Sequence, residues 1–262
     1  MSTRPIAPTS LVLTAILVLG CGAQDPVQPS STATSEAAAT AVPGGAAQAA
    51  ATVSELPPFD PDNFVRGVDH PLFPLPLGRR LIYKGSEDGE PEMVVTDVTR
   101  DHKTILGVPV VVVLDRVFQS GELTEKTFDW YAQDRQGNVW YFGEDTKEFE
   151  NGRVVSTAGS FEAGKHGARA GIIMRAHPKL FQITPQEEAP GVAEDKARVL
   201  GLDVTLTVPY GTLRHCLKTA EFTDLEPDAV EHKFYCPGIG VTRERDVRGG
   251  TVETSLTRIV SR

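Results

Sequence analysis

The chain has 262 residues, and Asp and Glu outnumber Lys and Arg by 35 to 26, which gives a formal net charge of −9 at pH 7. Since no basic patch stands out, the composition argues against nucleic acid as a partner. An acidic surface also disfavours broad contact with anionic lipid headgroups. These counts leave room for one acidic domain with a sizeable core.

The N-terminal end has the pattern of a lipoprotein signal. Arg4 precedes the apolar run Leu11–Leu19, which is shorter than the ~20 residues that a membrane-spanning helix needs. Small residues before Cys21 are the lipobox pattern, in which Cys21 is acylated and the acyl chains hold the protein to the membrane. Gly22 after the cysteine is typical of sorting to the outer membrane in a Gram-negative cell. An ordinary signal peptide cleaved near Ala23 is the alternative.

A flexible linker is expected behind this signal. Residues 22–58 are rich in Ala, Ser, Thr, Pro and Gly and hold almost no large apolar side chains. Such a segment cannot bury enough surface to offset the entropy lost on ordering. We therefore expect a signal peptide over 1–21, a disordered tether over 22–58 and a β-rich globular domain over 59–262.

The stretch Asp129–Thr146 predicts the central hairpin of a β-sheet. Asp134–Gly137 has the residues of a tight turn, because Asp bonds its own backbone there and Gly supplies a positive φ. The arms Leu123–Gln133 and Asn138–Gly143 are β-branched and aromatic, which suits a half-buried pleated surface.

Many more short strands joined by tight turns predict an all-β, mainly antiparallel domain. Asn151-Gly152 and Gly249-Gly250 have the residues of hairpin turns. A single domain is expected, a meander that forms a curved sheet, a sandwich or a half-barrel. The other expected strands are Leu81–Lys84, Met93–Thr99, Thr104–Phe118, Ile172–Met174, Leu202–Val208, Leu213–Phe222, Val230–Cys236, Val241–Val247 and Thr251–Val260.

Three further assignments concern less regular stretches. A turn at Asp101-His102 separates two of these strands, and the Gly- and Ala-rich residues 156–171 are expected to form a loop. Gly191–Leu200 is ambiguous, because Ala193–Arg198 has good helix propensity. We favour a strand there, since the stretch lies between strands and would bury few apolar residues as a helix.

A disulfide is expected between Cys216 and Cys236. The two cysteines lie at equal distances from the middle of the predicted turn Asp224–Asp228, so they face each other across an antiparallel ladder. Export supplies the oxidising compartment, and Cys21 is used by the lipid. The alternative is a pair of buried free thiols.

The central hairpin resembles a motif of a widespread, functionally uncharacterised family of bacterial lipoproteins and secreted proteins. The family pattern is D-W-x-A-Q-D-x-x-G-N-V-W-Y-x-G-E. Three other pieces agree with it: H-P-L-F-P-L at His70–Leu75, T-V-P-Y-G-T at Thr207–Thr212 and V-E-H-K-F-Y-C-P-G-I-G at Val230–Gly240. The resemblance implies an exported β-rich domain and brings no catalytic residues with it.

No motif in the chain predicts catalysis, a metal or a cofactor. Gly159–His166 is close to a phosphate-binding loop but has His where Ser or Thr must follow the Lys. The acidic turn at Asp60 does not follow the calcium-loop pattern. The histidines and cysteines show no zinc-ligand spacing, and there is no nucleophile elbow. We therefore expect no enzyme activity, no metal and no cofactor.

Large aromatic side chains occupy both faces of the central hairpin, because side chains alternate along a strand. The second face therefore needs a cover: the loop 156–171, the Pro-rich segment with Phe64, Leu72 and Phe73, or an apolar ligand. Simple packing is the plainer reading. For the ligand reading, Trp140 is the expected cavity residue because it lies near the rim at Gly143. The candidate ligand-lining residues are Phe128, Trp130, Trp140, Tyr141 and Phe142.

Two functions remain open from the sequence. The first is a lipid-anchored cell-envelope domain that binds an apolar or amphipathic small ligand, because a curved, aromatic sheet can enclose a cavity. The second is a structural or interaction lipoprotein that binds an envelope protein or a glycan and no small ligand. A large aromatic cavity would favour the first, and a filled core with an exposed apolar patch would favour the second.

Overall fold

The computed structural model describes residues 53–261, so Cys21 and most of the expected tether lie outside it. Val53 forms a β-bridge with Ile183, and the amide of Ser54 donates a 2.8 Å hydrogen bond to the Ile183 carbonyl. Val53 and Ser54 therefore already pair with the domain, ahead of the boundary at Phe59 expected from composition.

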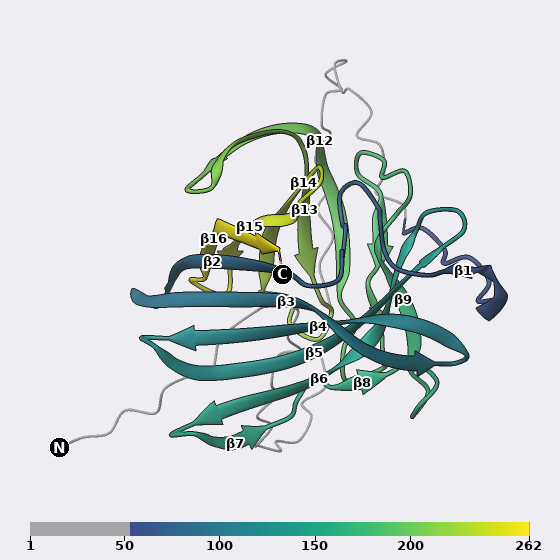
Figure 1. The fold of residues 1–262 in the computed structure, drawn as a ribbon, viewed down its shortest axis with the longest axis horizontal. Helices are drawn as coiled ribbons and strands as arrows, with labels where there is room; N and C mark the ends of the chain where they lie inside the picture. Colours follow the sequence, from purple (N-terminus) through teal and green to yellow (C-terminus); the bar gives the residue numbers. More distant parts are fainter. Residues whose placement is uncertain (1–52, 262) are drawn as a thin grey trace, which may run out of the picture.

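The described chain is almost entirely β-structure in one antiparallel sheet that curls on itself (Figure 1). The strands follow the order β10-β12-β13-β14-β15-β16-β2-β3-β4-β5-β6-β9-β11. The elements are η1 (Pro61–Asn63), β1 (Phe64–Val65), β2 (Arg79–Glu87), β3 (Glu90–Ile105), β4 (Val108–Gln119), β5 (Glu122–Asp134), β6 (Val139–Glu150), β7 (Arg153–Ser156), β8 (Phe161–Glu162), β9 (Arg169–Met174), β10 (Ile183–Pro185), β11 (Glu187–Glu188), β12 (Lys196–Val208), β13 (Gly211–Phe222), β14 (Val230–Cys236), β15 (Gly240–Arg248) and β16 (Glu253–Ser261).

One short segment nearly closes the sheet. Strands β10 and β11 follow each other in the chain, but β10 pairs with β12 at one end of the sheet and β11 pairs with β9 at the other. Gly171 on β9 permits the close approach, because a Cβ there would lie 2.2 Å from the Gln186 carbonyl oxygen. The all-β, single-domain prediction is confirmed, with a nearly closed sheet in place of a two-sheet sandwich.

The inner face of this curled sheet holds the main core. Its buried side chains come from both halves of the sheet, including Val113 on β4, Tyr131 on β5 and Leu217 on β13. The segment before β2 adds Phe73, whose ring centroid lies 5.2 Å from that of Tyr131. The inner face is therefore the place where distant parts of the chain meet.

The leading segment, residues 53–78 ahead of β2, also covers the outer face of the central hairpin. Phe59 and Phe64 pack against Trp140 and Phe142, with ring centroids between 5.5 and 6.3 Å apart. Trp130 lies in the same outer cluster. The two faces are thus both buried, and packing by the Pro-rich segment supplies the cover on this side.

The predicted turns at three hairpins are confirmed. Asn151-Gly152 joins β6 to β7, and Gly249-Gly250 lies between β15 and β16. At the central hairpin, Asp134 accepts hydrogen bonds from the Asn138 amide and from the Trp140 indole, both at 2.8 Å. Gly137 has a φ of 93°, as the turn requires.

Four assignments along the strands were wrong in detail. Asp101-His102 lies inside β3 beside a bulge, because β3 runs on to Ile105. The run Thr104–Phe118 is divided between β3 and β4, since Leu106-Gly107 turns the chain with positive φ at both residues. In Gly191–Leu200 the favoured strand is present but starts only at Lys196, and residues 156–171 contain β8 and the start of β9.

The predicted disulfide is present. Leu217 lies opposite Tyr235, so the next pair outward in the same register is Cys216 and Cys236. Their sulfurs are bonded, and their Cα atoms lie 4.2 Å apart. The pair is completely buried in a small apolar cluster at this end of β13 and β14.

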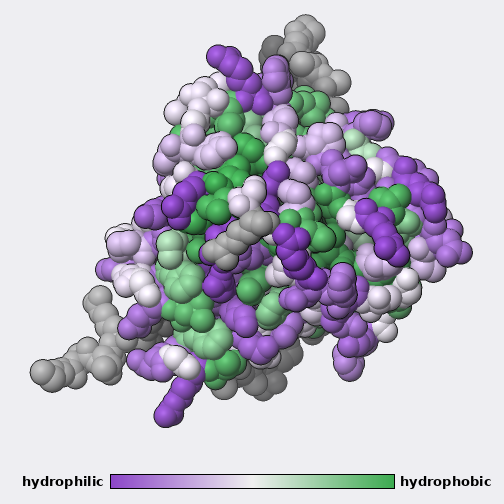
Figure 2. Space-filling view, in the orientation of Figure 1, coloured by the Kyte–Doolittle hydropathy of each residue, from purple (hydrophilic) through white to green (hydrophobic). Residues whose placement is uncertain are grey.

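The viewed surface mixes apolar and polar side chains. Figure 2 shows apolar (green) areas on this face in several patches, separated by hydrophilic (purple) side chains. Large exposed apolar residues of the described chain include Leu77, Leu180 and Phe181 on loops and Leu202 on β12. The mixed surface gives no single broad apolar area on the face shown.

Candidate functional site

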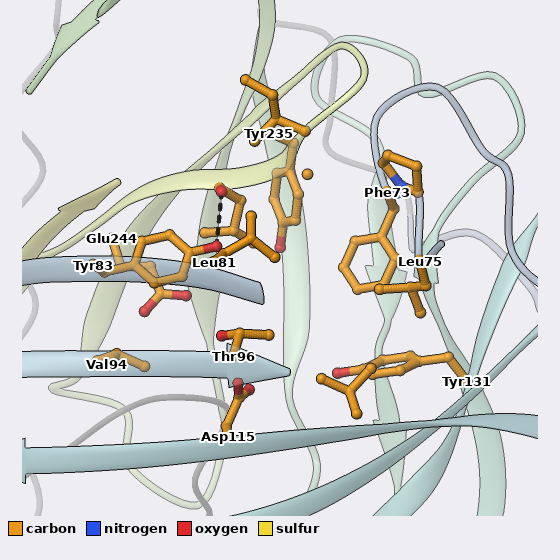
Figure 3. A pocket seen from close by; sticks show the side chains of 15 residues that line it. Phe73, Leu75, Leu81, Tyr83, Val94, Thr96, Asp115, Tyr131, Tyr235 and Glu244 are labelled. Atoms are coloured by element: carbon orange, nitrogen blue, oxygen red, sulfur yellow. Dashed lines mark hydrogen bonds between the residues drawn. The ribbon is translucent and has the colours of Figure 1, made fainter. Parts of the chain in front are cut away.

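A cavity of about 80 Å³ opens between the leading segment and the inner face of the sheet (Figure 3). Phe73, Leu75 and Tyr131 lie on one side of it, and Tyr83 lies on the opposite side. Tyr235 on β14 also lines it. The cavity is therefore walled mainly by aromatic and aliphatic side chains from the segment before β2 and from several strands of the sheet.

Hydrogen bonds hold the leading segment over this cavity. The side-chain oxygen of Gln133 accepts from the amides of Asp69 and His70, both at 3.0 Å. On the other side, the Gly238 amide donates a 2.8 Å bond to the Pro71 carbonyl. Residues from His70–Leu75, from the central hairpin and from Val230–Gly240 thus meet at the cavity.

Two carboxyl groups give the cavity a polar end. Asp115 on β4 and Glu244 on β15 both line it. Burial raises the pKa of Asp115 to about 6 and that of Glu244 to about 7. One carboxylate oxygen of Asp115, Oδ1, is buried without a hydrogen-bond partner. The hydroxyl of Tyr83 is already used, because it donates a 3.0 Å bond to the Val241 carbonyl.

Beneath the cavity, Lys233 on β14 lies among three carboxylates. Its Nζ is 3.2 Å from Glu221, 3.4 Å from Glu231 and 3.8 Å from Glu244, and its side chain is 1% exposed. Burial by itself would lower the pKa of Lys233, but the surrounding carboxylates outweigh it and hold the pKa well above its usual value. The inner face therefore carries a buried ion-pair network.

A second acidic cluster lies on β5 and β6. The positive φ of Gly143 accompanies a bulge, after which Glu144 turns to the inner face opposite Asp129. The Tyr141 hydroxyl lies 2.8 Å from Asp129 Oδ1 and 2.7 Å from Glu144 Oε2. A hydroxyl has one proton to donate, so one of the two carboxyls must carry a proton. Burial raises the pKa of both carboxyls well above the usual value.

The structure places none of the five candidate ligand-lining residues on this cavity. Trp130, Trp140 and Phe142 lie in the outer cluster, and Phe128 packs against it. Tyr141 faces inward but is used in the carboxyl cluster. The expectation that Trp140 lines a cavity is not met here, because Phe59 and Phe64 already cover that face of the hairpin.

Sequence reasoning missed the carboxylates of the inner face. In the β14 sequence V-E-H-K-F-Y-C, alternation puts Glu231, Lys233 and Tyr235 on one face. Charged residues at alternate positions are the usual pattern of a solvated face, so the sequence of this strand gives no reason to place that face inside. A signal was present in Tyr235, whose large ring shares the face of the two charges.

Comparisons with known proteins give little further guidance. No protein-family model and no curated protein matches the chain. Among solved structures, the chain is similar to a crystal structure at 2.70 Å resolution of a protein described as a "putative lipoprotein" from Parabacteroides distasonis ATCC 8503. The identity is 13%, the TM-score is 0.40, and the match covers 73% of this chain and 99% of the other. A likeness at this level carries no argument about function.

Proposed function

We propose that this protein is a lipid-anchored domain of the cell envelope that binds a small amphipathic ligand in the inner cavity. The observation that carries the proposal is the cavity's two-sided lining. Phe73, Leu75 and Tyr131 offer apolar contact, while Asp115 and Glu244 offer hydrogen-bond acceptors at the other end. A ligand with an apolar part and a donor group matches both.

The size of the cavity limits the ligand. Drug-sized ligands occupy sites of roughly 300–1,000 Å³. The cavity here is about 80 Å³, so the ligand is small or inserts only one apolar end. This fits a binding role for a short-chain alcohol, amine or similar compound better than enclosure of a whole lipid.

A blocking substitution tests the binding proposal. Leu75 lines the cavity, so Leu75→Trp should fill part of it and abolish the saturation-transfer NMR signal of 1-hexanol, a small neutral amphipath. Leu77→Trp is the matched control, because Leu77 is two residues away and 51% exposed. The proposal fails if Leu75→Trp and the wild-type protein give the same signal. Native mass spectrometry of protein purified from its own host would identify a retained ligand.

Anchoring has its own test, because Cys21 lies outside the described residues. Among residues 53–261, no helix is long and apolar enough to cross a membrane. If Cys21 is acylated, Cys21→Ser should remove the lipid mass and release the protein from the membrane fraction. A variant that keeps both the lipid mass and the membrane location would rule the anchor out. In a Gram-negative host, we place the anchored protein in the outer membrane.

The alternative function is an interaction protein without a small ligand, and fewer observations support it than support the cavity ligand. A docking face would need a broad apolar area, and the viewed face has separated patches instead (Figure 2). No specific observation favours a protein or glycan partner over the cavity ligand.

A further inference from the structure

A second cavity lies on the other side of the Lys233 network. It measures about 40 Å³ and opens where the turn after β13 meets the glycine turn between β15 and β16. Its lining is mainly acidic, and the guanidinium of Arg248, which also lines it, donates hydrogen bonds to the Asp228 and Pro227 carbonyls. The carboxylates that line it are Asp195, Glu221, Glu226, Glu231 and Asp246.

Sheet register forces three of these carboxylates together. Glu231 on β14 lies directly opposite Glu221 on β13 and directly opposite Asp246 on β15. Like charges at directly opposed positions destabilise a sheet. Such an arrangement therefore needs protons or a cation to offset the repulsion.

Two of the three carboxylates already have hydrogen-bond partners. Glu221 accepts bonds from the Tyr235 hydroxyl at 2.7 Å and from the Thr219 hydroxyl at 3.0 Å. Asp246 accepts a 2.9 Å bond from the Val252 amide. These two side chains are thus held by the protein's own donors.

Glu231 differs from Glu221 and Asp246 in its hydrogen bonding. The residue is 1% exposed, it lines the cavity, and neither of its carboxylate oxygens has a hydrogen-bond partner. The nearest cation, Lys233 Nζ, is 3.4 Å away and is also close to Glu221. Lys233 is shared among three carboxylates, so the carboxylate of Glu231 has part of one cation and no hydrogen bond, which is costly for a buried acceptor. An occupant of the cavity that brings donors would remove this cost.

We propose that this second cavity binds a small ammonium group, with Glu231 as its buried acceptor and Glu226 and Asp195 at the cavity wall. An ammonium group carries a positive charge and several N–H donors in about the volume of a water molecule. Direct coordination of a metal ion fits less well. In the part of the chain that the structure describes, no three His, Cys, Asp or Glu side chains are arranged to hold one ion. This site is separate from the amphipathic-ligand cavity and does not depend on it.

Methylammonium chloride is the probe, and the full-length protein in detergent is the sample. The thermal midpoint Tm is followed as the methylammonium concentration rises, and the apparent Kd is taken from that dependence. Tetramethylammonium chloride at equal ionic strength is the control, because it has the charge but no N–H donors. We expect methylammonium to raise Tm and tetramethylammonium to leave it unchanged.

Variants locate the effect. Glu231→Gln and Glu226→Gln should each weaken the apparent affinity for methylammonium at least tenfold. Glu122→Gln, an exposed acid on β5 away from the cavity, and Leu75→Trp in the other cavity should not. Because Glu226 is less buried than Glu231, its variant decides the question if Glu231→Gln does not fold. Equal stabilisation by both salts, or full affinity in the Glu226 and Glu231 variants, would overturn the proposal. So would calcium chloride that stabilises at a concentration a hundredfold lower than methylammonium.

Discussion

Lys233 Nζ lies 3.2 Å from Glu221 Oε2, and the two side chains are only 1% and 4% exposed. The same carboxylate group accepts a bond from Tyr235, so β13 and β14 are joined by an ion pair and a hydroxyl bond inside the sheet. Forming such a pair costs desolvation of both ions, and removing one partner leaves the other buried and uncompensated. Lys233 therefore controls how much unpaired negative charge the inner face holds.

Replacing Lys233 should lower the free energy of unfolding by more than the loss of its apolar contacts would. We expect Lys233→Met, which is similar in shape, to lower the free energy of unfolding by about 3–5 kcal/mol, because a buried ion pair is broken. Urea denaturation followed by circular dichroism gives the value. Lys147→Met is the control: its ion pair with Asp145 is half-exposed and should contribute less than about 1 kcal/mol. A Lys233 variant as stable as the control would contradict the role given to the network.

Stability should fall as pH rises through the neutral range. Burial raises the pKa of Asp115 and Asp195 to about 6, of Glu244 to about 7 and of Glu87 to about 8. The unfolded values are roughly 3.9–4.3, so the folded protein binds more protons and is favoured at lower pH. This contribution is complete below the unfolded pKa and is lost as pH passes the folded pKa.

Calorimetry between pH 5 and 8.5 checks this dependence. We expect the highest Tm near pH 5 and a steady decrease toward pH 8.5. Glu244→Gln should flatten the curve around pH 7, since the amide does not titrate. A Tm that stays constant or rises over this interval would show that these carboxyls are ionised in the folded state.

The disulfide should stabilise the β13–β14 hairpin. Cys216 and Cys236 are 20 residues apart, and closing a loop of this length contributes about 3 kcal/mol in the chain-entropy model. Reduction, or the double variant Cys216→Ser/Cys236→Ser, should lower the free energy of unfolding by that amount. A thiol count on the unfolded, unreduced protein gives the direct check. Two reactive thiols would show that the bond does not form.

Trp140 should act as a core residue. Its side chain is 3% exposed and packs on Phe59 and Phe64, so Trp140→Ala should cost about 3–5 kcal/mol. Trp140→Phe keeps most of this packing but loses the indole bond to Asp134, and it should cost less. Binding of 1-hexanol by the folded fraction should not change in either variant. Loss of binding in a folded Trp140 variant would instead support the ligand-lining role first expected for it.

Local signals accounted for a large part of the fold. The turns at Asn151-Gly152 and Gly249-Gly250 and the symmetry of the two cysteines about the turn at residues 224–228 involve neighbours along the chain. Their geometry follows from backbone preferences and from the period of two along a strand. The strand limits were less accurate: the bulged part of β3 at Asp101-His102 was predicted as a turn, and the turn at Leu106-Gly107 was missed, because tertiary pairing overrides weak local preference.

The candidate sites were beyond such local reasoning. Alternation along β14 shows from the residues alone that Glu231, Lys233 and Tyr235 share a face, but it does not show on which side of the sheet that face lies. The answer comes from segments far apart in the chain. Strands β10 and β11 join the two ends of the sheet, and the segment with Phe73 lies over its inner face. This enclosure removes water from the carboxylates, raises their pKa values and turns a face that is charged in sequence into the interior of the domain.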